Sequence, residues 1–252
     1  MKKLGLLLLF AIVLALACPK VFCAPIPFSA KADDGLVLKG ALYLPDGAKE
    51  ARPVVILLPM MANDRKSWGD FPAKLAAAGY VVLAMDQRGH GESVWQGKQK
   101  KVFSKFTNSE FAKMVTDLDA VLAALPKQKK VDVTRVAIYG ASIGANVALV
   151  YASAHPEVKA VALLSPGMDY KGITISDAAV SYDNRAALIV AAEKDGYSAL
   201  SARKLADKMG APAALKIYEG KEHGTRLFSE QKDFGQFLFD WTTANFPVTS
   251  QE

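Results

Sequence analysis

The chain has 252 residues, of which 51% are hydrophobic and 22% are charged. This balance, without a low-complexity tract or a repeating period, excludes disordered and solenoid proteins and is typical of a globular enzyme or binding protein. The formal net charge of +6 bears on solubility and weak association rather than on the fold.

Residues 1–23 have the pattern of a secretory signal. Two lysines precede an apolar run that ends at Ala17, and this run is too short for a membrane span, which needs about 20 apolar residues. We therefore expect an exported protein, periplasmic or secreted, whose mature form is the single domain 24–252 without a membrane span. Lipidation at Cys18 and an uncleaved N-terminal anchor are the alternatives. Both cysteines, Cys18 and Cys23, lie in this leader, so the predicted domain has no internal disulfide.

The predicted domain begins with an antiparallel hairpin. Two segments of alternating hydrophobicity, 28–32 and 36–44, flank the tripeptide Asp-Asp-Gly at 33–35. The glycine supplies the backbone angles that a tight turn requires. This hairpin is the first part of the predicted sheet.

Downstream of the hairpin, short apolar runs alternate with segments of helical spacing. Apolar runs of this kind are typical of strands buried on both faces. The predicted strands are 54–58, 81–85, 135–139, 158–164, 187–191 and 215–218, and the predicted helices are 71–78, 109–125, 144–154, 199–209 and 225–246. The alternation predicts an α/β fold with a mostly parallel central sheet, helices on both faces and no large cap domain.

The segment Gly140-Ala141-Ser142-Ile143-Gly144 joins a predicted strand to a predicted helix. This is a G-x-S-x-G pattern in the context that presents a serine hydroxyl to a substrate, since glycines avoid the Cβ collisions of so sharp a turn. The N–H of Ile143 begins the helix and favours negative charge. We predict Ser142 as a nucleophile and Ile143 as an oxyanion donor. The alternative is that these residues form only a tight turn with no catalytic role. A turn of that kind would not need a strand before it and a helix after it, so the flanking pattern favours a nucleophile.

A serine nucleophile needs a general base, and the chain has three histidines. His155 ends the helix after Ser142 and is too far along it to reach back. His90 follows an earlier strand and is an alternative base. We predict His223, which follows the last predicted strand, because the order nucleophile, acid, histidine is the one that accompanies this elbow.

The base in turn needs a carboxylate that fixes its tautomer and stabilises its positive charge. Asp195 follows the predicted strand 187–191, at the edge of a parallel sheet where ligands collect. Glu193 lies two residues earlier and is the alternative. We predict Asp195 as the acid.

These motifs together resemble the α/β-hydrolase superfamily, across nearly the whole predicted domain. Four segments occur in the family's order: DQRGHGES at 86–93, GASIG at 140–144, AAEKDG at 191–196 and EHG at 222–224. The resemblance implies a triad of Ser142, Asp195 and His223. The lack of a long insertion after the strand 158–164 is similar to compact members such as small esterases and dienelactone-hydrolase-like proteins.

One segment departs from the family's pattern. Where members often have His-Gly and a further glycine after the first buried strand, this chain has Pro59-Met60-Met61. A backbone N–H does not depend on the side chain, so the amide of Met60 or Met61 is expected to be the second oxyanion donor. Their thioethers either form an apolar pocket wall or pack in the core.

We therefore expect a serine hydrolase that cleaves a small-molecule carboxylic ester through an acyl-enzyme. No cofactor or metal is expected, because the histidines are isolated and no phosphate-binding loop occurs. A thioesterase or peptidase would use the same triad, and a non-catalytic binding module could keep the fold. The basic residues Lys98, Lys100, Lys101 and Lys105 are interpreted as a solvated loop rather than a polyanion surface, and no nucleic-acid partner is expected.

Overall fold

The computed structural model describes residues 24–128, 130–210 and 213–249. The leader predicted at residues 1–23, with the lipidation alternative at Cys18, lies outside these ranges, so export and lipidation stay predictions. In the described ranges, no helix is both long enough and apolar enough to cross a membrane.

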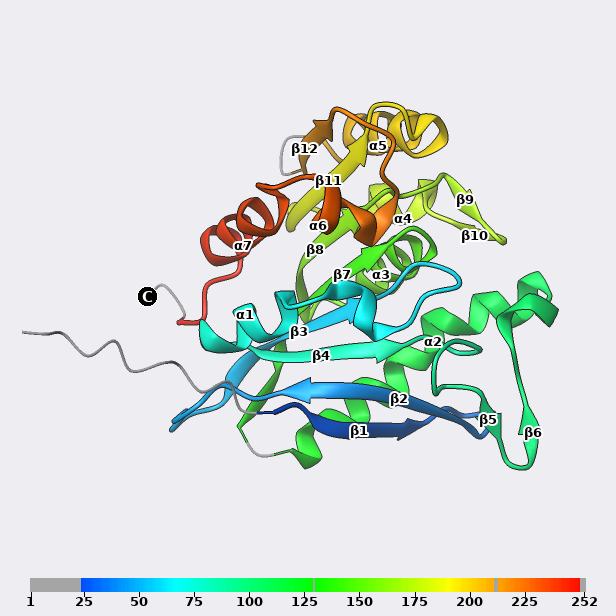
Figure 1. Cartoon of the computed structure of the whole chain (residues 1–252), viewed down its shortest axis with the longest axis vertical. Coiled ribbons are helices and arrows are strands. Elements are labelled where there is room, and N and C mark those ends of the chain that lie inside the picture. Colours follow the sequence, from blue (N-terminus) through cyan, green and yellow to red (C-terminus); the bar gives the residue numbers. More distant parts are fainter. Residues whose placement is uncertain (1–23, 129, 211–212, 250–252) are drawn as a thin grey trace, which may run out of the picture.

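The predicted hairpin is present at one end of the sheet (Figure 1). Strand β1 (Ile26–Lys31) pairs antiparallel with β2 (Leu36–Tyr43), and the turn between them contains Gly35 at a φ of 85°. Alternate side chains of β1, including Phe28 and Ala30, are buried, which is the period-two pattern expected of a strand with one face on the core.

The predicted buried runs form the rest of a mostly parallel sheet. They are β3 (Arg52–Leu58), β4 (Val81–Asp86), β7 (Val131–Ala141), β8 (Val158–Leu164), β11 (Ala186–Ala192) and β12 (Ala213–Tyr218). The spatial order is β12-β11-β8-β7-β3-β4-β2, in which only the β4–β2 pairing is antiparallel. The predicted fold is therefore confirmed, and the carboxyl ends of the parallel strands meet at one edge of the sheet.

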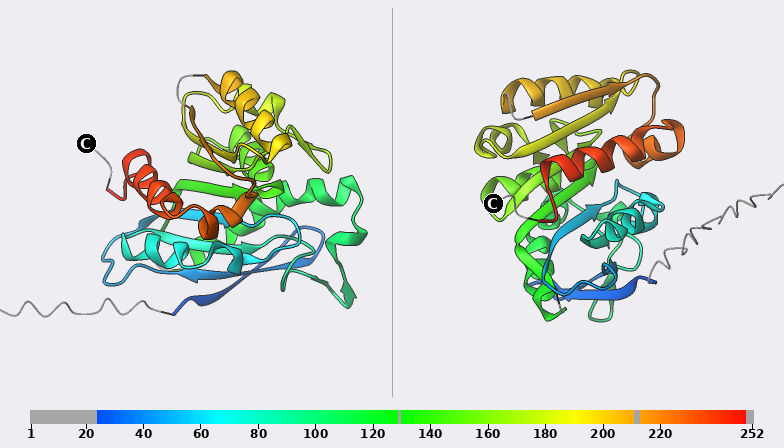
Figure 2. Two further views of the ribbon diagram at one scale, coloured as in Figure 1. Left: turned by 45° about the horizontal axis from the view of Figure 1, so that its top comes forward. Right: turned by 90° about the vertical axis from the view of Figure 1, so that its left-hand side faces the viewer.

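Helices cover both faces of the sheet (Figure 2). They are α1 (Phe71–Ala77), α2 (Asn108–Ala124), α3 (Ile143–Ala154), α4 (Ser176–Ser181), α5 (Gly196–Met209), α6 (Leu227–Glu230) and α7 (Phe234–Asn245). Alternate residues of β3 belong to different core layers: Ile56 lies in the layer that includes residues of α2, α3 and α5, whereas Leu57 lies in the layer that includes residues of α1, α6 and α7. Burying a side chain of this size contributes about 1.5–3 kcal/mol, so both layers stabilise the sheet.

The single helix predicted for residues 225–246 is wrong. The segment consists of a 3₁₀ turn, η4 (Gly224–Arg226), followed by α6 and, after a break, α7. Gln231 leaves the helical conformation at a φ of −106° and a ψ of 103°, and its side-chain amide donates to the carbonyl oxygen of Glu219 at 2.7 Å. The bend brings the rings of Phe228 and Phe234 to a centroid distance of 4.8 Å, so packing outweighs the helical spacing.

The two longest interruptions of the pattern contain small elements that sequence patterning missed. In the basic loop, β5 (Trp95–Gln96) and β6 (Gln99–Lys100) form a hairpin whose first strand pairs with β2, and η2 (Phe103–Lys105) follows. The side chains of Lys98, Lys100 and Lys105 are exposed, as expected for a solvated segment. The second interruption contains β9 (Asp169–Tyr170), β10 (Ile173–Thr174) and α4. The remaining 3₁₀ turns are η1 (Arg65–Trp68) and η3 (Leu125–Lys127).

A buried arginine connects three parts of the fold. Arg88, in the loop after β4, donates to Asp117 of α2 through Nε at 2.7 Å and Nη2 at 2.5 Å, and to Asp34 of the β1–β2 turn at 2.9 Å. Burial raises the pKa of Asp117, although Arg88 opposes this shift. Burial also acts to raise the pKa of Asp34, but its hydrogen bonds, first among them the one from Arg88, lower that pKa to about 2.

We predict that Arg88→Met lowers the free energy of unfolding by about 3–5 kcal/mol, because it leaves the buried Asp117 carboxylate without a partner. Urea denaturation followed by circular dichroism measures this change. The matched control is Lys113→Met: Lys113 is half exposed and contacts Asp34 at 3.1 Å, so its loss should cost less than about 1 kcal/mol. Equal losses in the two variants would contradict a special role for Arg88.

Candidate active site

Ser142 lies at the sharp turn between β7 and α3, as predicted. Its backbone has a φ of 54° and a ψ of −120°, a region that costs a non-glycine residue about 1–3 kcal/mol. A Cβ at Gly140 would lie 2.0 Å from the carbonyl oxygen of Gly144, so a side chain there is excluded. The two glycines therefore permit the turn, and the surrounding structure holds Ser142 in its strained conformation.

The same turn brings the start of α3 against the end of β3. A Cβ at Gly144 would lie 2.7 Å from the carbonyl oxygens of both Leu58 and Pro59. The loop after β3, which contains Met60 and Met61, consequently begins beside the N-terminus of α3. Of the two methionine side chains, Met60 is buried and Met61 is partly exposed.

Three backbone N–H groups of this region are candidate oxyanion donors. Ile143 is the first residue of α3, so its N–H has no partner within the helix. In the described part of the chain, the N–H groups of Met60 and Met61 donate no hydrogen bond. An unpaired N–H at a helix N-terminus favours negative charge. Both methionine amides stay candidates for the second donor.

Asp195 and His223 form a direct pair across the edge of the sheet. Asp195 follows β11 and His223 follows β12, and the Nδ1 of His223 lies 2.7 Å from Oδ2 of Asp195. The alternative acid, Glu193, instead pairs with Arg203 at 2.7 Å on the exposed surface. Of the two carboxylates that the sequence left open, only Asp195 is in contact with His223.

The His223 loop also lies against the serine turn. A Cβ at Gly224 would lie 3.3 Å from the Cβ of Ala141 and 2.9 Å from the Sδ of Met60. The residue after His223 is therefore packed on the residue before Ser142. The N–H of Gly224 donates to Oγ of Ser165 at 2.9 Å, which fixes the loop in this position.

Ser165 is a site residue that sequence patterning missed. It is fully buried at the end of β8, and its φ of 51° turns the chain away from the strand. Burial acts to raise the pKa of Asp195, but hydrogen bonding from His223, Ser165 and Ser198 outweighs burial, so this pKa lies below its usual range. Asp195 therefore stays ionised, and Ser165 connects it to the backbone of Gly224.

Tyr170 is a second missed residue, and it lies beside His223. Its ring centroid is 6.4 Å from that of His223 in an edge-on arrangement, and its hydroxyl lies 2.9 Å from Oγ of Ser198. Burial raises the pKa of Tyr170, while hydrogen bonding with Ser198 and Ser142 opposes the shift. The Tyr170 hydroxyl also donates to the carbonyl oxygen of Ser165 at 3.4 Å, at this edge of the sheet.

The other two histidines, His155 and His90, pack against aromatic rings outside the proposed site. His155 stacks on Tyr151 at 3.7 Å and its Nδ1 lies 2.7 Å from the Tyr151 carbonyl oxygen. His90 is buried against Phe103, and burial lowers its pKa. Neither ring contacts a carboxylate in the way that His223 contacts Asp195, although Nε2 of His155 lies 3.5 Å from Asp119 at the surface.

Relatives among curated proteins are partial matches. A thiohydrolase from Arthrinium phaeospermum is 30% identical over 145 residues, which are 54% of this chain and 41% of the relative. An uncharacterized protein from Mycobacterium tuberculosis is 30% identical over 124 residues, which are 49% of this chain and 32% of that protein. The chain thus spans less than half the length of either relative.

Solved structures match over nearly the whole described chain. An esterase from Pyrococcus furiosus is 16% identical, with a TM-score of 0.69 over 89% of this chain and 92% of that chain. A putative dienelactone hydrolase from Klebsiella pneumoniae is 19% identical, with a TM-score of 0.70 over 90% and 100%. An α/β hydrolase from Penicillium sp. is 15% identical, with a TM-score of 0.74 over 89% and 99%. At these identities the likeness shows a shared fold.

The family is shown by a family model described as serine aminopeptidase, S33, which matches residues 49–182. This range is more than half of the chain, and it includes the Ser142 turn and the loop after β3, whereas Asp195 and His223 lie beyond it. By fold and by family match, the chain belongs to the serine aminopeptidase S33 family of α/β hydrolases.

Proposed function

We propose that this hydrolase cleaves a carboxylic ester through an acyl-enzyme formed on Ser142. The observation that carries the proposal is the 2.7 Å pair of Asp195 and His223 on a loop packed against the Ser142 turn. An ionised carboxylate beside an imidazole, next to a strained serine, is the arrangement that activates a hydroxyl nucleophile.

In the proposed reaction, Oγ of Ser142 attacks the carbonyl carbon while Nε2 of His223 takes its proton. The carbonyl oxygen becomes an oxyanion, which accepts hydrogen bonds from the N–H groups of Ile143 and of Met60 or Met61. The bond to the alcohol oxygen then breaks, and His223 gives its proton to that oxygen. Water attacks the acyl-enzyme with His223 again as base, which releases the acid and restores the Ser142 hydroxyl.

Asp195 supports both steps in this scheme. Its contact with Nδ1 fixes the His223 tautomer that leaves Nε2 free to accept a proton. Its lowered pKa keeps the negative charge that stabilises the imidazolium formed during attack. Ser165 and Tyr170 are positioning residues in this proposal, because Ser165 holds the His223 loop and the ring of Tyr170 lies edge-on to that of His223.

Replacing the nucleophile is the direct test. We predict that Ser142→Ala lowers kcat for p-nitrophenyl acetate by at least about a thousandfold, the scale seen when a triad member is removed. Ser153→Ala, on the partly exposed side of α3, is the control and should keep full activity. A fluorophosphonate probe should label the parent and the control, but not Ser142→Ala. A parent protein that is neither active nor labelled would indicate a non-catalytic binding module.

The acid is tested by two matched neutral substitutions. We predict that Asp195→Asn lowers kcat by about a thousandfold or more, because the amide cannot hold the required His223 tautomer. Glu193→Gln, two residues away, should change kcat by less than twofold because Glu193 pairs with Arg203 instead. Steady-state kinetics with p-nitrophenyl acetate at pH 7 to 8 distinguishes them. The opposite ranking would assign the acid to Glu193.

A thioester is the second candidate substrate class, because one relative is a thiohydrolase. The same triad would serve, with a thiolate as the leaving group. We predict a higher kcat/KM for phenyl butyrate than for S-phenyl thiobutyrate, and little turnover of alanine p-nitroanilide, which represents the peptidase alternative. A tenfold preference for the thioester or the anilide would reassign the substrate class.

A further inference from the structure

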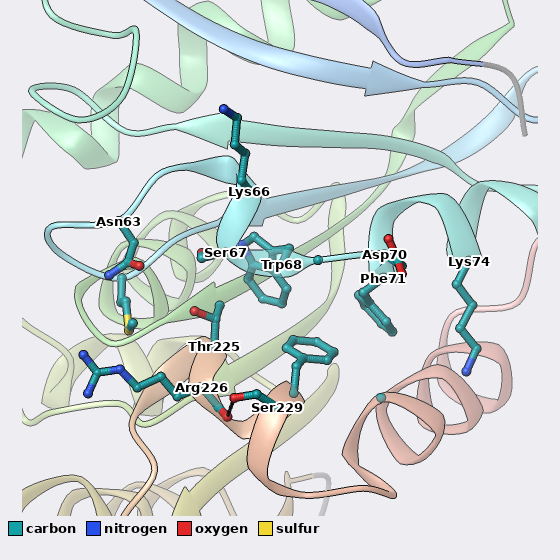
Figure 3. Close-up of a pocket in the computed structure, with 14 residues that line it drawn as sticks. Asn63, Lys66, Ser67, Trp68, Asp70, Phe71, Lys74, Thr225, Arg226 and Ser229 are labelled. Carbon is teal, nitrogen blue, oxygen red and sulfur yellow. Dashed lines mark hydrogen bonds between the residues drawn. The ribbon is translucent and has the colours of Figure 1, made fainter.

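A cavity of about 590 Å³ lies beside the His223 loop, between the loop after β3 and the chain's last two helices (Figure 3). Its lining comes from the segment that runs through η1 and the start of α1, and from η4, α6 and the first turn of α7. Cavities of about 300–1,000 Å³ are the size that small-molecule ligands occupy. The proposed catalytic residues themselves do not line it.

The interior of the cavity is aromatic. The ring centroids of Trp68 and Phe71 lie 5.8 Å and 5.3 Å from that of Phe228, and all three side chains are lining residues. In Figure 3 the charged ends of Lys66 and Arg226 point away from Trp68. Lys66, Asp70, Lys74 and Arg226 are also lining residues, but the cavity wall is mainly apolar at this aromatic cluster, which suits a hydrocarbon group rather than an ion.

One buried polar atom accompanies this apolar wall. Trp68 is fully buried, and among the described residues its indole Nε1–H has no hydrogen-bond partner. A buried donor without a partner costs free energy. Because this N–H is inaccessible to solvent, it is the aromatic wall of the cavity that favours an apolar group such as an acyl chain.

The cavity is connected to the proposed site through shared residues. Met60 lines it and belongs to the candidate oxyanion loop, while Thr225 lines it two residues after His223. Gly224 lies between these two walls and packs on both Met60 and Ala141. A substrate whose carbonyl oxygen faces the amides near Met60 would have its acyl side toward the cavity, while its alcohol oxygen faces His223.

We propose that this cavity is the acyl pocket of the enzyme and that it receives a medium-length alkyl chain, so that the substrates are medium-chain esters. The proposal rests on the proposed ester hydrolysis. It assigns a substrate class to a site for which family and fold supply only a reaction type.

The proposal is tested by substitutions that add a side chain inside the cavity, at a position where a Cβ fits. Gly235 lines the cavity in the first turn of α7, and a Cβ there meets nothing closer than 3.6 Å, the distance to Cδ1 of Phe228. Gly235→Phe and the smaller Gly235→Leu therefore place a Cβ without a clash and extend from a position that lines the cavity. Thr243→Phe, which adds the same ring to the exposed face of α7, is the matched control.

The parent should have a higher kcat/KM for p-nitrophenyl octanoate than for p-nitrophenyl acetate. We expect Gly235→Phe to reduce the octanoate-to-acetate ratio at least tenfold, Gly235→Leu to reduce it less, and Thr243→Phe to keep the parental ratio. Thermal unfolding checks that each variant is folded. An unchanged ratio in both folded Gly235 variants, or a parent without any octanoate preference, would overturn the acyl-pocket assignment.

A binding measurement separates this inference from the reaction. In Ser142→Ala protein, methyl octanoate should change the tryptophan fluorescence, and both Trp68→Phe and Gly235→Phe should remove that change. If the parent cleaves no ester but this signal is present, ester hydrolysis fails and the pocket for an apolar chain stands. If esters are cleaved and the signal is absent, the reaction stands and the pocket assignment is overturned.

Discussion

The backbone of Ser142 is the constraint on which the rest of the site depends. A φ of 54° turns the chain from strand to helix within one residue, and Gly140 and Gly144 leave no room for a side chain on either side of it. The turn stacks α3 on the end of β3, which brings the Met60 loop beside the free N–H of Ile143. This one strained residue therefore determines where a hydroxyl, a helix N-terminus and a second loop meet. Packing in the two core layers offsets the free energy that its backbone conformation costs.

The remaining polar groups of the site follow from the parallel sheet. Three neighbouring strands, β8, β11 and β12, end at the same edge, and the residues after them are Ser165, Asp195 and His223. The hydroxyl oxygen of Ser165 accepts a hydrogen bond from the N–H of Gly224. The same hydroxyl helps to lower the pKa of Asp195, and Asp195 in turn contacts His223. Buried polar groups that satisfy one another in this way hold a single geometry. The catalytic proposal therefore rests on a small network and not on an isolated pair.

The family match and the fold identify a hydrolase, but they leave its substrate open, because this fold supports many acyl-transfer reactions. The features that could select a substrate lie in the segments around the proposed site. Here they are the short segment with Tyr170, the methionine-containing loop after β3, and the broken helix near the C-terminus. The last two of these segments meet at the aromatic cavity beside Met60, which is where we propose the acyl pocket.

The sequence by itself determined the order of the main strands and helices and the Ser142 turn, and it predicted His223 as the base, because each depends on local patterns: apolar runs, glycine spacing and position after a strand. For the predicted acid it left Asp195 and Glu193 open, and only the structure showed that Asp195 contacts His223 whereas Glu193 contacts Arg203. No sequence pattern near Ser165, Tyr170 or the aromatic cavity predicts their place in the structure, since the residues that they contact are distant in the chain. The break at Gln231 likewise depends on Glu219 and on packing between Phe228 and Phe234. Tertiary structure decided these features because contacts between distant segments outweigh local helical propensity.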